Sequence, residues 1–179
     1  MRHVFPCGTP ALDFVGTLHA RRAPAPIERI TTPGLLDSWF VESGLLDREP
    51  GSGQADLRAA IALREAIYTL VAARLDGRSL PAVAVAAVNR QAASVPVAMC
   101  LGSAGASRSG TADHALTDLA REAVETVAGA EAELLRECGH PDCTQVYLDR
   151  SRGRRREWCA MRTCGNRVKA AALRSRRRR

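Results

Sequence analysis

Four cysteines in the last quarter of the 179-residue chain are the residues best suited to chemistry, and that chemistry is metal binding. Four residues separate the cysteines within each of two pairs, and fifteen residues separate the pairs. A cysteine pair on a tight turn supplies two sulfur ligands, so two such pairs brought together complete a tetrahedral zinc site. Four sulfurs leave no open coordination position for a reacting group. We therefore predict one structural Zn²⁺ per chain, held by Cys138, Cys143, Cys159 and Cys164.

Other interpretations of these cysteines remain open. They could form disulfides, which require an oxidising compartment, or be unrelated buried thiols, and His140 inside the first pair could replace one of them as a ligand. The N-terminal residues lack the apolar core of an export signal, and no run of about 18 apolar residues predicts a membrane span. We therefore expect reduced thiols in a cytoplasmic protein with no membrane partner, with Cys7 and Cys100 as ordinary buried thiols.

Basic residues are concentrated around the same cysteines. Residues 138–179 contain 13 Lys and Arg against three Asp and Glu, a formal charge of +10, whereas residues 1–137 contain 13 against 16, a formal −3. Such a local excess is typical of a surface that binds a polyanion, although a solvated tail that aids solubility would also be basic. Arginine suits both phosphate and guanine. The candidate nucleic-acid contacts are Arg152, Arg154, Arg155 and Arg156 in a turn, and Arg167, Lys169, Arg174 and Arg176 in a C-terminal helix.

A hairpin and a helix would have to position these groups. We expect residues 146–148 and 155–158 to pair across the turn at 151–154, with Tyr147 and Trp158 covering the metal. A helix would run from Cys164 to about Ser175 and pack Val168, Ala171 and Ala172 on the hairpin. This order is treble-clef-like, with a zinc ribbon as the alternative. The segment has almost no apolar core of its own, so metal binding must stabilise it. Arg167 could instead be structural and pack on Trp158.

The rest of the chain predicts an α+β fold with a mainly helical N-terminal domain. We expect residues 1–132 to fold by themselves and residues 133–179 to form the zinc finger. The predicted strands, 95–101 and 111–115, enclose a Gly/Ser-rich loop at 102–110. The predicted helices cover residues 35–43, 56–75, 79–93 and 116–128. The second and third of these are expected to form the core, with the third well buried because its Ala/Val run is apolar on most sides.

Two segments resemble a known family. Trp158-Cys159 and Cys164-Gly165-Asn166-Arg167, together with the upstream cysteine pair and residues 148–151, resemble the CGNR zinc finger over roughly residues 134–179. In that family the finger follows an ABATE domain, a type associated with stress-induced transcription regulation. Leu12 to Leu18 is similar to the opening signature of that domain, with Gly16 where the signature has Asn. The resemblance implies a transcription regulator.

We therefore expect a zinc-dependent DNA-binding protein, a bacterial transcription regulator whose N-terminal domain senses a small molecule or forms a homodimer. One alternative is an RNA-binding zinc protein. Another is an N-terminal receptor or enzyme for which the finger is only an assembly module. No nucleotide-binding, zinc-protease or serine-hydrolase motif is present, so we expect no enzymatic activity. His19, close to Arg21 and Arg22, is either simply exposed or part of an anion site, and Trp39 is either a core residue or a ligand-stacking one.

Overall fold

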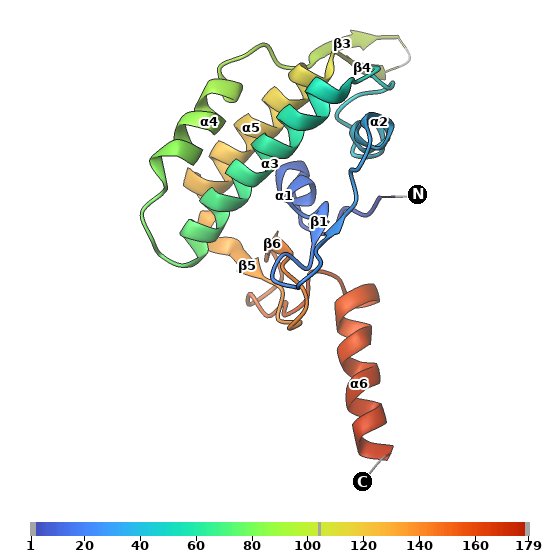
Figure 1. Cartoon of the computed structure of the whole chain (residues 1–179), viewed down its shortest axis with the longest axis vertical. Helices are drawn as coiled ribbons and strands as arrows, with labels where there is room; N and C mark the ends of the chain where they lie inside the picture. The colour runs from blue at the N-terminus through green and yellow to red at the C-terminus, as the bar shows by residue number, and fades with distance from the viewer. Residues whose placement is uncertain (1–2, 104, 178–179) are drawn as a thin grey trace.

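The computed structural model shows a helical body, with small antiparallel sheets and one helix that projects from it (Figure 1). It describes residues 3–103 and 105–177, except for the side chains of residues 172 and 175–177. The elements run in the order α1 (Pro10–Val15), β1 (Leu18–His19), β2 (Ile27–Glu28), α2 (Pro33–Glu42), α3 (Gln54–Leu75), α4 (Ala82–Ala92), β3 (Ala98–Gly102), β4 (Gly105–Ser109), α5 (Ala112–Ala128), the 3-10 turn η1 (Ala132–Leu134), β5 (Leu135–Glu137), β6 (Val146–Leu148), the π-helical turn η2 (Met161–Gly165) and α6 (Asn166–Arg177). The predicted α+β class is confirmed.

Helices α1, α3 and α5 form the centre of the body. The short α1 is buried from Ala11 to Val15, and its first turn is capped by Thr9, whose hydroxyl accepts a hydrogen bond of 3.3 Å from the Leu12 amide. Helix α5 faces it with a stripe of small and branched residues, among them Ala120 and Leu119, both fully buried. Small side chains allow the helix axes to approach closely, so the alanine-rich composition builds the core directly.

Helix α4 is not the well-buried helix that its composition predicted. It packs on α3 and α5 from the outside, with only Ala84 and Val88 of this helix buried, and Val83 is 85% exposed. Its Ala/Val run is apolar on most sides, but a helix against one side of a body buries only one stripe. The inner position belongs to α1, whose short apolar run gave no clear helical period.

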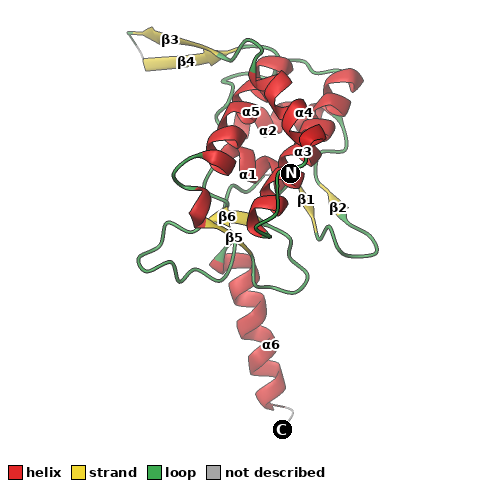
Figure 2. Ribbon diagram, turned by 90° about the vertical axis from the view of Figure 1, so that its left-hand side faces the viewer, coloured by secondary structure: helices red, strands yellow, loops and turns green. Residues whose placement is uncertain are grey.

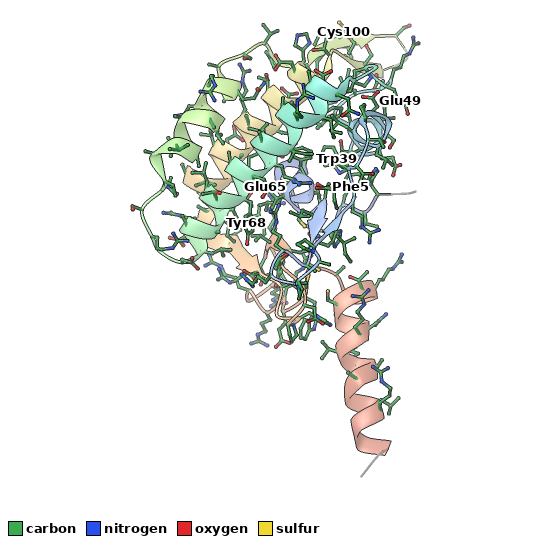
Figure 3. The ribbon with its side chains drawn as sticks, in the orientation of Figure 1. Phe5, Trp39, Glu49, Glu65, Tyr68 and Cys100 are labelled. Carbon is green, nitrogen blue, oxygen red and sulfur yellow. The ribbon has the colours of Figure 1, made fainter. Side chains whose placement is uncertain are left out.

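The predicted strand after α4 forms, but its partner lies elsewhere. Strand β3 pairs with β4 in register Met99 to Arg108, and the hairpin projects from the end of the body opposite α6 (Figure 2). The return strand therefore lies inside the Gly/Ser-rich stretch, and residues 112–115 begin α5 because Thr111 caps that helix. Cys100, expected to be buried, is exposed on this hairpin (Figure 3).

A buried arginine ties the β1–β2 loop to α3. Arg64 is 2% exposed; its two terminal nitrogens each lie 2.7 Å from a carboxylate oxygen of Glu28, and one of them also donates to Thr17. The Nε of Arg64 donates a hydrogen bond to the Glu65 carboxylate, which also accepts a hydrogen bond from Arg21. A bidentate pair of this kind fixes orientation as well as charge. The loop that carries His19 and Arg29 is therefore held against the body.

The sheet β5–β6 belongs to the core of the body as well as to the finger. Leu135, Tyr147 and Leu148 are each 2% exposed or less and join the same apolar cluster as α1 and α5. The Leu148 amide donates to the Cys7 carbonyl at 2.9 Å. The predicted pairing of residues 146–148 with 155–158 is wrong, because β6 pairs with β5 instead. The domain boundary at 132/133 stays a prediction, and one continuous core spans it.

Candidate metal centre and basic surface

The four predicted cysteines come together at the lower end of the body. Their Sγ atoms all lie within 4.8 Å of one another, with 3.8 Å between Cys143 and Cys159 and 3.6 Å between Cys159 and Cys164. A tetrahedron with zinc–sulfur bonds of about 2.3 Å has sulfur–sulfur edges of ~3.8 Å. The cysteine geometry therefore fits one zinc ion with four sulfur ligands, and the zinc-finger assignment of this segment is confirmed.

Backbone turns hold each pair of ligands. The Cys143 amide closes the first turn on the His140 carbonyl at 2.9 Å, and the Cys159 amide points at the Cys138 sulfur at 3.3 Å. Gly139 fits closely in the first turn, because a Cβ there would lie 3.3 Å from both the Glu157 carbonyl oxygen and the Trp158 ring. Its amide donates to that same carbonyl. His140 uses Nδ1 to accept from the Asp142 amide, so it acts on the turn.

The crowded sulfurs explain why a divalent cation belongs here. Hydrogen bonds from Cys143 and Cys159 lower the pKa of the Cys138 thiol. The hydrogen bond to Cys138 in turn raises the pKa of Cys143 to about 12 and also raises that of Cys159. Without metal, the Cys138 thiol therefore loses its proton easily, whereas Cys143 and Cys159 hold theirs more strongly. A dication offsets this repulsion and allows all four ligands to be thiolates.

Arg156, one of the predicted nucleic-acid contacts, is engaged with other groups of the protein. Its guanidinium lies 4.2 Å above the Tyr147 ring, and its nitrogens donate to the carbonyls of Trp158, Pro6 and Cys159. The Tyr147 hydroxyl donates to the Arg156 carbonyl at 2.5 Å, and burial raises the pKa of that hydroxyl to about 12. These groups join the metal loop to the N-terminal residues of the body. Arg156 therefore has a structural role, and its contact with nucleic acid stays a prediction.

The neighbouring arginines have the opposite environment. Arg152, Arg154 and Arg155 are exposed in the loop that follows β6. Asp149 stabilises the conformation of this loop, because its carboxylate accepts hydrogen bonds from the amides of Ser151 and Arg156. The three exposed guanidiniums are thus presented on a turn that is anchored to the buried end of the finger.

Helix α6 begins directly after the last metal ligand and extends away from the body in both views (Figures 1 and 2). Arg167, Lys169 and Arg174 are exposed along it, and Leu173 is 52% exposed. The expected packing of Val168, Ala171 and Ala172 on a hairpin is therefore wrong: Val168 is half-buried, Ala171 is exposed, and the Ala172 side chain lies outside the description. The Arg176 side chain, another predicted contact, also lies outside it.

The basic positions of α6 fall on two sides. Successive residues turn by about 100° around a helix, so Arg167 and Arg174 share one side and Lys169 and Arg176 occupy positions on the nearly opposite side. One of the faces between these two sides carries Ala170 and Leu173, with Arg177 at a position on the same face in the last turn, and the other carries Val168 and Ala171. The helix thus has two basic flanks separated by largely apolar faces.

Gln145 links the finger to the body, and the sequence alone did not identify it. Its amide nitrogen donates to the Gly16 carbonyl at 2.8 Å, and its oxygen accepts from the Cys7 thiol at 3.1 Å. A Cβ at position 16 would lie 2.3 Å from that amide oxygen. Gly16 therefore makes room for Gln145, which links α1 to the finger close to Cys143. The only sequence feature that could have indicated this link is Gly16, which stands where the signature has Asn. One sequence cannot show that Gln145 fills the space beside it.

Two family models match the chain in succession. The ABATE model, described as "Putative stress-induced transcription regulator", matches residues 8–137, and the CGNR zinc finger model matches residues 135–177. The two matches meet on β5, the strand that lies in the body's core. A search among curated proteins found no match. Within the described residues, none of the helices is both long and apolar enough to cross a membrane.

Proposed function

Because the chain belongs to the ABATE family and ends in a CGNR zinc finger, we propose that it is a zinc-dependent DNA-binding regulator of transcription. The observation that carries this proposal is a basic helix that leaves the body at the zinc centre and whose described side chains, apart from that of Val168, are exposed. A helix whose described side chains are mostly exposed is suited to a partner from outside. The opposite charge signs of finger and body, +10 and −3, would orient that partner toward the helix.

The dimensions of α6 suit the major groove of DNA. Its 12 residues span ~18 Å at about 1.5 Å per residue, and the major groove, about 12 Å wide, admits one α-helix. In this arrangement the two basic flanks would face the phosphates on either side of the groove. The largely apolar face with Ala170 and Leu173 would then lie against base edges, where apolar side chains contact thymine methyl groups.

The basic loop would add contacts to the phosphate backbone. Arg152, Arg154 and Arg155 are exposed on the segment that anchors the finger, so they are fixed relative to the base of α6. Phosphate contacts fix register and orientation, whereas base contacts select sequence. We therefore assign affinity to the loop and the flanks of α6, and sequence choice to the face with Ala170 and Leu173.

The zinc has a structural role in this proposal. Four sulfur ligands fill its coordination shell, so we assign it no catalytic step. Zinc thiolates persist where thiols stay reduced, which supports the proposal of a cytoplasmic protein. Homodimer formation stays a prediction.

A salt-dependent titration tests DNA binding. Zinc-loaded protein is added to labelled duplex DNA and to a structured RNA of equal length, and anisotropy is followed at several salt concentrations. We expect tighter binding to the duplex. The slope of the logarithm of the binding constant against the logarithm of salt concentration should flatten by about 0.9 for each phosphate contact removed. Tighter binding to the RNA would favour the RNA-binding alternative. If deleting residues 176–179 removes all binding and replacing Lys169 and Arg174 by Ala removes none, the basic tail is the only contact.

A further inference from the structure

A cavity of about 450 Å³ lies where the finger meets the body. The body contributes the β1–β2 loop and α2, with His19, Ile27, Arg29 and Trp39 in the wall; the finger contributes Gln145, three of the metal cysteines and Arg167. This volume lies in the range of small-molecule sites, which are apolar clefts with a few convergent polar groups. The β1–β2 loop is held by the Arg64–Glu28 pair, so this wall is preformed.

One part of the cavity is basic. Burial lowers the pKa of His19, and the charges of Arg29 and Arg167 lower it further, so both guanidiniums act on the same imidazole. Arg29 also lowers the pKa of His3, another wall residue. Arg29 comes from the body and Arg167 from the first turn of α6. The two parts of the chain thus direct positive charge into one space.

The remaining wall residues include apolar side chains that suit an apolar part of a ligand. Trp39 is 1% exposed and is fixed by Phe14 and Phe5, with ring centroids 5.0 and 5.9 Å away (Figure 3). Ile27 is 49% exposed and also lines the cavity. The acidic wall residues are Asp142, exposed, and Asp13, where burial raises the pKa to about 7 and so weakens the charge near neutral pH. Metal thiolates also line the cavity, so an anionic group would lie at the arginine and imidazole side.

We propose that this cavity binds a small carboxylic acid with an apolar body, and that it is the effector site of the protein. The carboxylate would be held by Arg29, His19 and Arg167, and the apolar body would lie against Trp39 and Ile27. Arginine suits this task because its planar fork matches a carboxylate.

The position of Arg167 connects this site to α6. The same side chain lines the cavity and stands on one basic flank of the helix. A bound carboxylate would neutralise it and remove one charge from the DNA-binding surface. Effector and DNA should therefore weaken each other's binding by the same factor. This coupling rests on the proposed function; binding in the cavity does not.

Calorimetry on the zinc-loaded full chain tests the site without DNA. The probes are benzoate and hexanoate, with benzyl alcohol as the uncharged counterpart and inorganic phosphate as an anion without an apolar body. We expect saturable binding of at least one carboxylate and much weaker binding of the other two. Ile27→Glu places a negative charge at an exposed wall position, and Arg167→Gln removes a charged donor; each should weaken carboxylate binding about tenfold or more.

Matched variants keep this test sharp. Val83→Glu makes the same change at a position on α4 that is 85% exposed and outside the cavity, and Lys169→Gln removes a basic residue of α6 that does not line it. Both should bind carboxylate as the wild type does. The proposal is overturned if neither carboxylate binds, or if binding survives both Ile27→Glu and Arg167→Gln. If benzoate binds but leaves DNA affinity unchanged, the coupling is wrong and the site stands.

Discussion

The two ends of the zinc finger differ in how they are held. Strand β6 is packed into the body, where Tyr147 is 1% exposed and Leu148 is 2% exposed. Helix α6 follows the last cysteine, and its described side chains are mostly exposed, with Leu173 52% exposed. The first end is stabilised by burial of apolar surface, as any core strand is. The second depends on the metal and on its own backbone hydrogen bonds.

This difference indicates what the metal contributes. Body contacts hold β5 and β6, so zinc is not required to keep these strands in place. It is required to fix Cys159 and Cys164 against Cys138 and Cys143, and through Cys164 it fixes the first turn of α6. The zinc thus joins a rigid body to a helix that makes few contacts with it. An effector in the adjacent cavity would act at this junction.

Zinc removal should have the largest effect and should affect the two ends unequally. Structural zinc binding releases about 10–16 kcal/mol in zinc-finger peptides. After Cys159→Ser with Cys164→Ser, we expect no bound zinc and rapid amide exchange in residues 149–177, while residues 135–137 and 146–148 stay protected. Elemental analysis and hydrogen-exchange mass spectrometry measure this. Wild-type zinc content in the double variant would contradict the ligand assignment.

Truncation across the predicted domain boundary should have the next largest effect. A fragment ending at residue 132 loses Leu135, Val146, Tyr147 and Leu148, all buried. At about 1.5–3 kcal/mol each, their burial contributes at most roughly 6–12 kcal/mol, comparable to the whole stability of a domain. A fragment ending at residue 150 keeps them. We expect the longer fragment to melt cooperatively and the shorter one to melt far lower or not at all, as circular dichroism would show. Equal melting temperatures would support an independent domain at 1–132.

Replacing single side chains by alanine should also affect the stability of the protein unequally at the two ends of the finger. Tyr147→Ala removes a buried ring and should lower the free energy of unfolding by about 3–5 kcal/mol. Leu173→Ala removes a large apolar group from α6 and should change it by less than about 0.5 kcal/mol. Urea denaturation of the zinc-loaded proteins measures both. A large loss for Leu173→Ala would mean that α6 packs on the body in solution.

Adjacent arginines should give the smallest but most discriminating difference. Arg156→Ala leaves three carbonyls without their donor and should destabilise the protein by about 2–3 kcal/mol. Arg155→Ala should leave stability within about 0.5 kcal/mol and flatten the salt dependence of DNA binding by about 0.9. Urea denaturation and a salt series of DNA titrations provide the two readouts. The assignment is wrong if the two variants exchange these effects.

Some of this could be predicted from the sequence, because it depends on local spacing. The repeated cysteine interval identified all four ligands, and the helix predicted at residues 35–43 forms as α2, Pro33–Glu42. The pairing of β6 could not be predicted, because residues 155–158 and 135–137 are both short and the choice follows from packing Tyr147 into the body. Nor could Arg156 be separated from Arg155 within a run of arginines. Only the tertiary positions of Tyr147 and Pro6 distinguish them.

The central claim is that α6, held by zinc, is the part that binds DNA. Ala170→Pro tests it most directly, because proline inside a helix costs about 3 kcal/mol or more and leaves every charge and metal ligand in place. Labelled duplex is titrated with this variant and with Ala170→Ser as the control. We expect Ala170→Pro to keep its zinc and the melting temperature of the body while losing most of its DNA affinity, and Ala170→Ser to bind nearly as the wild type does. Wild-type affinity in Ala170→Pro would contradict the claim, because basic charge alone would then suffice.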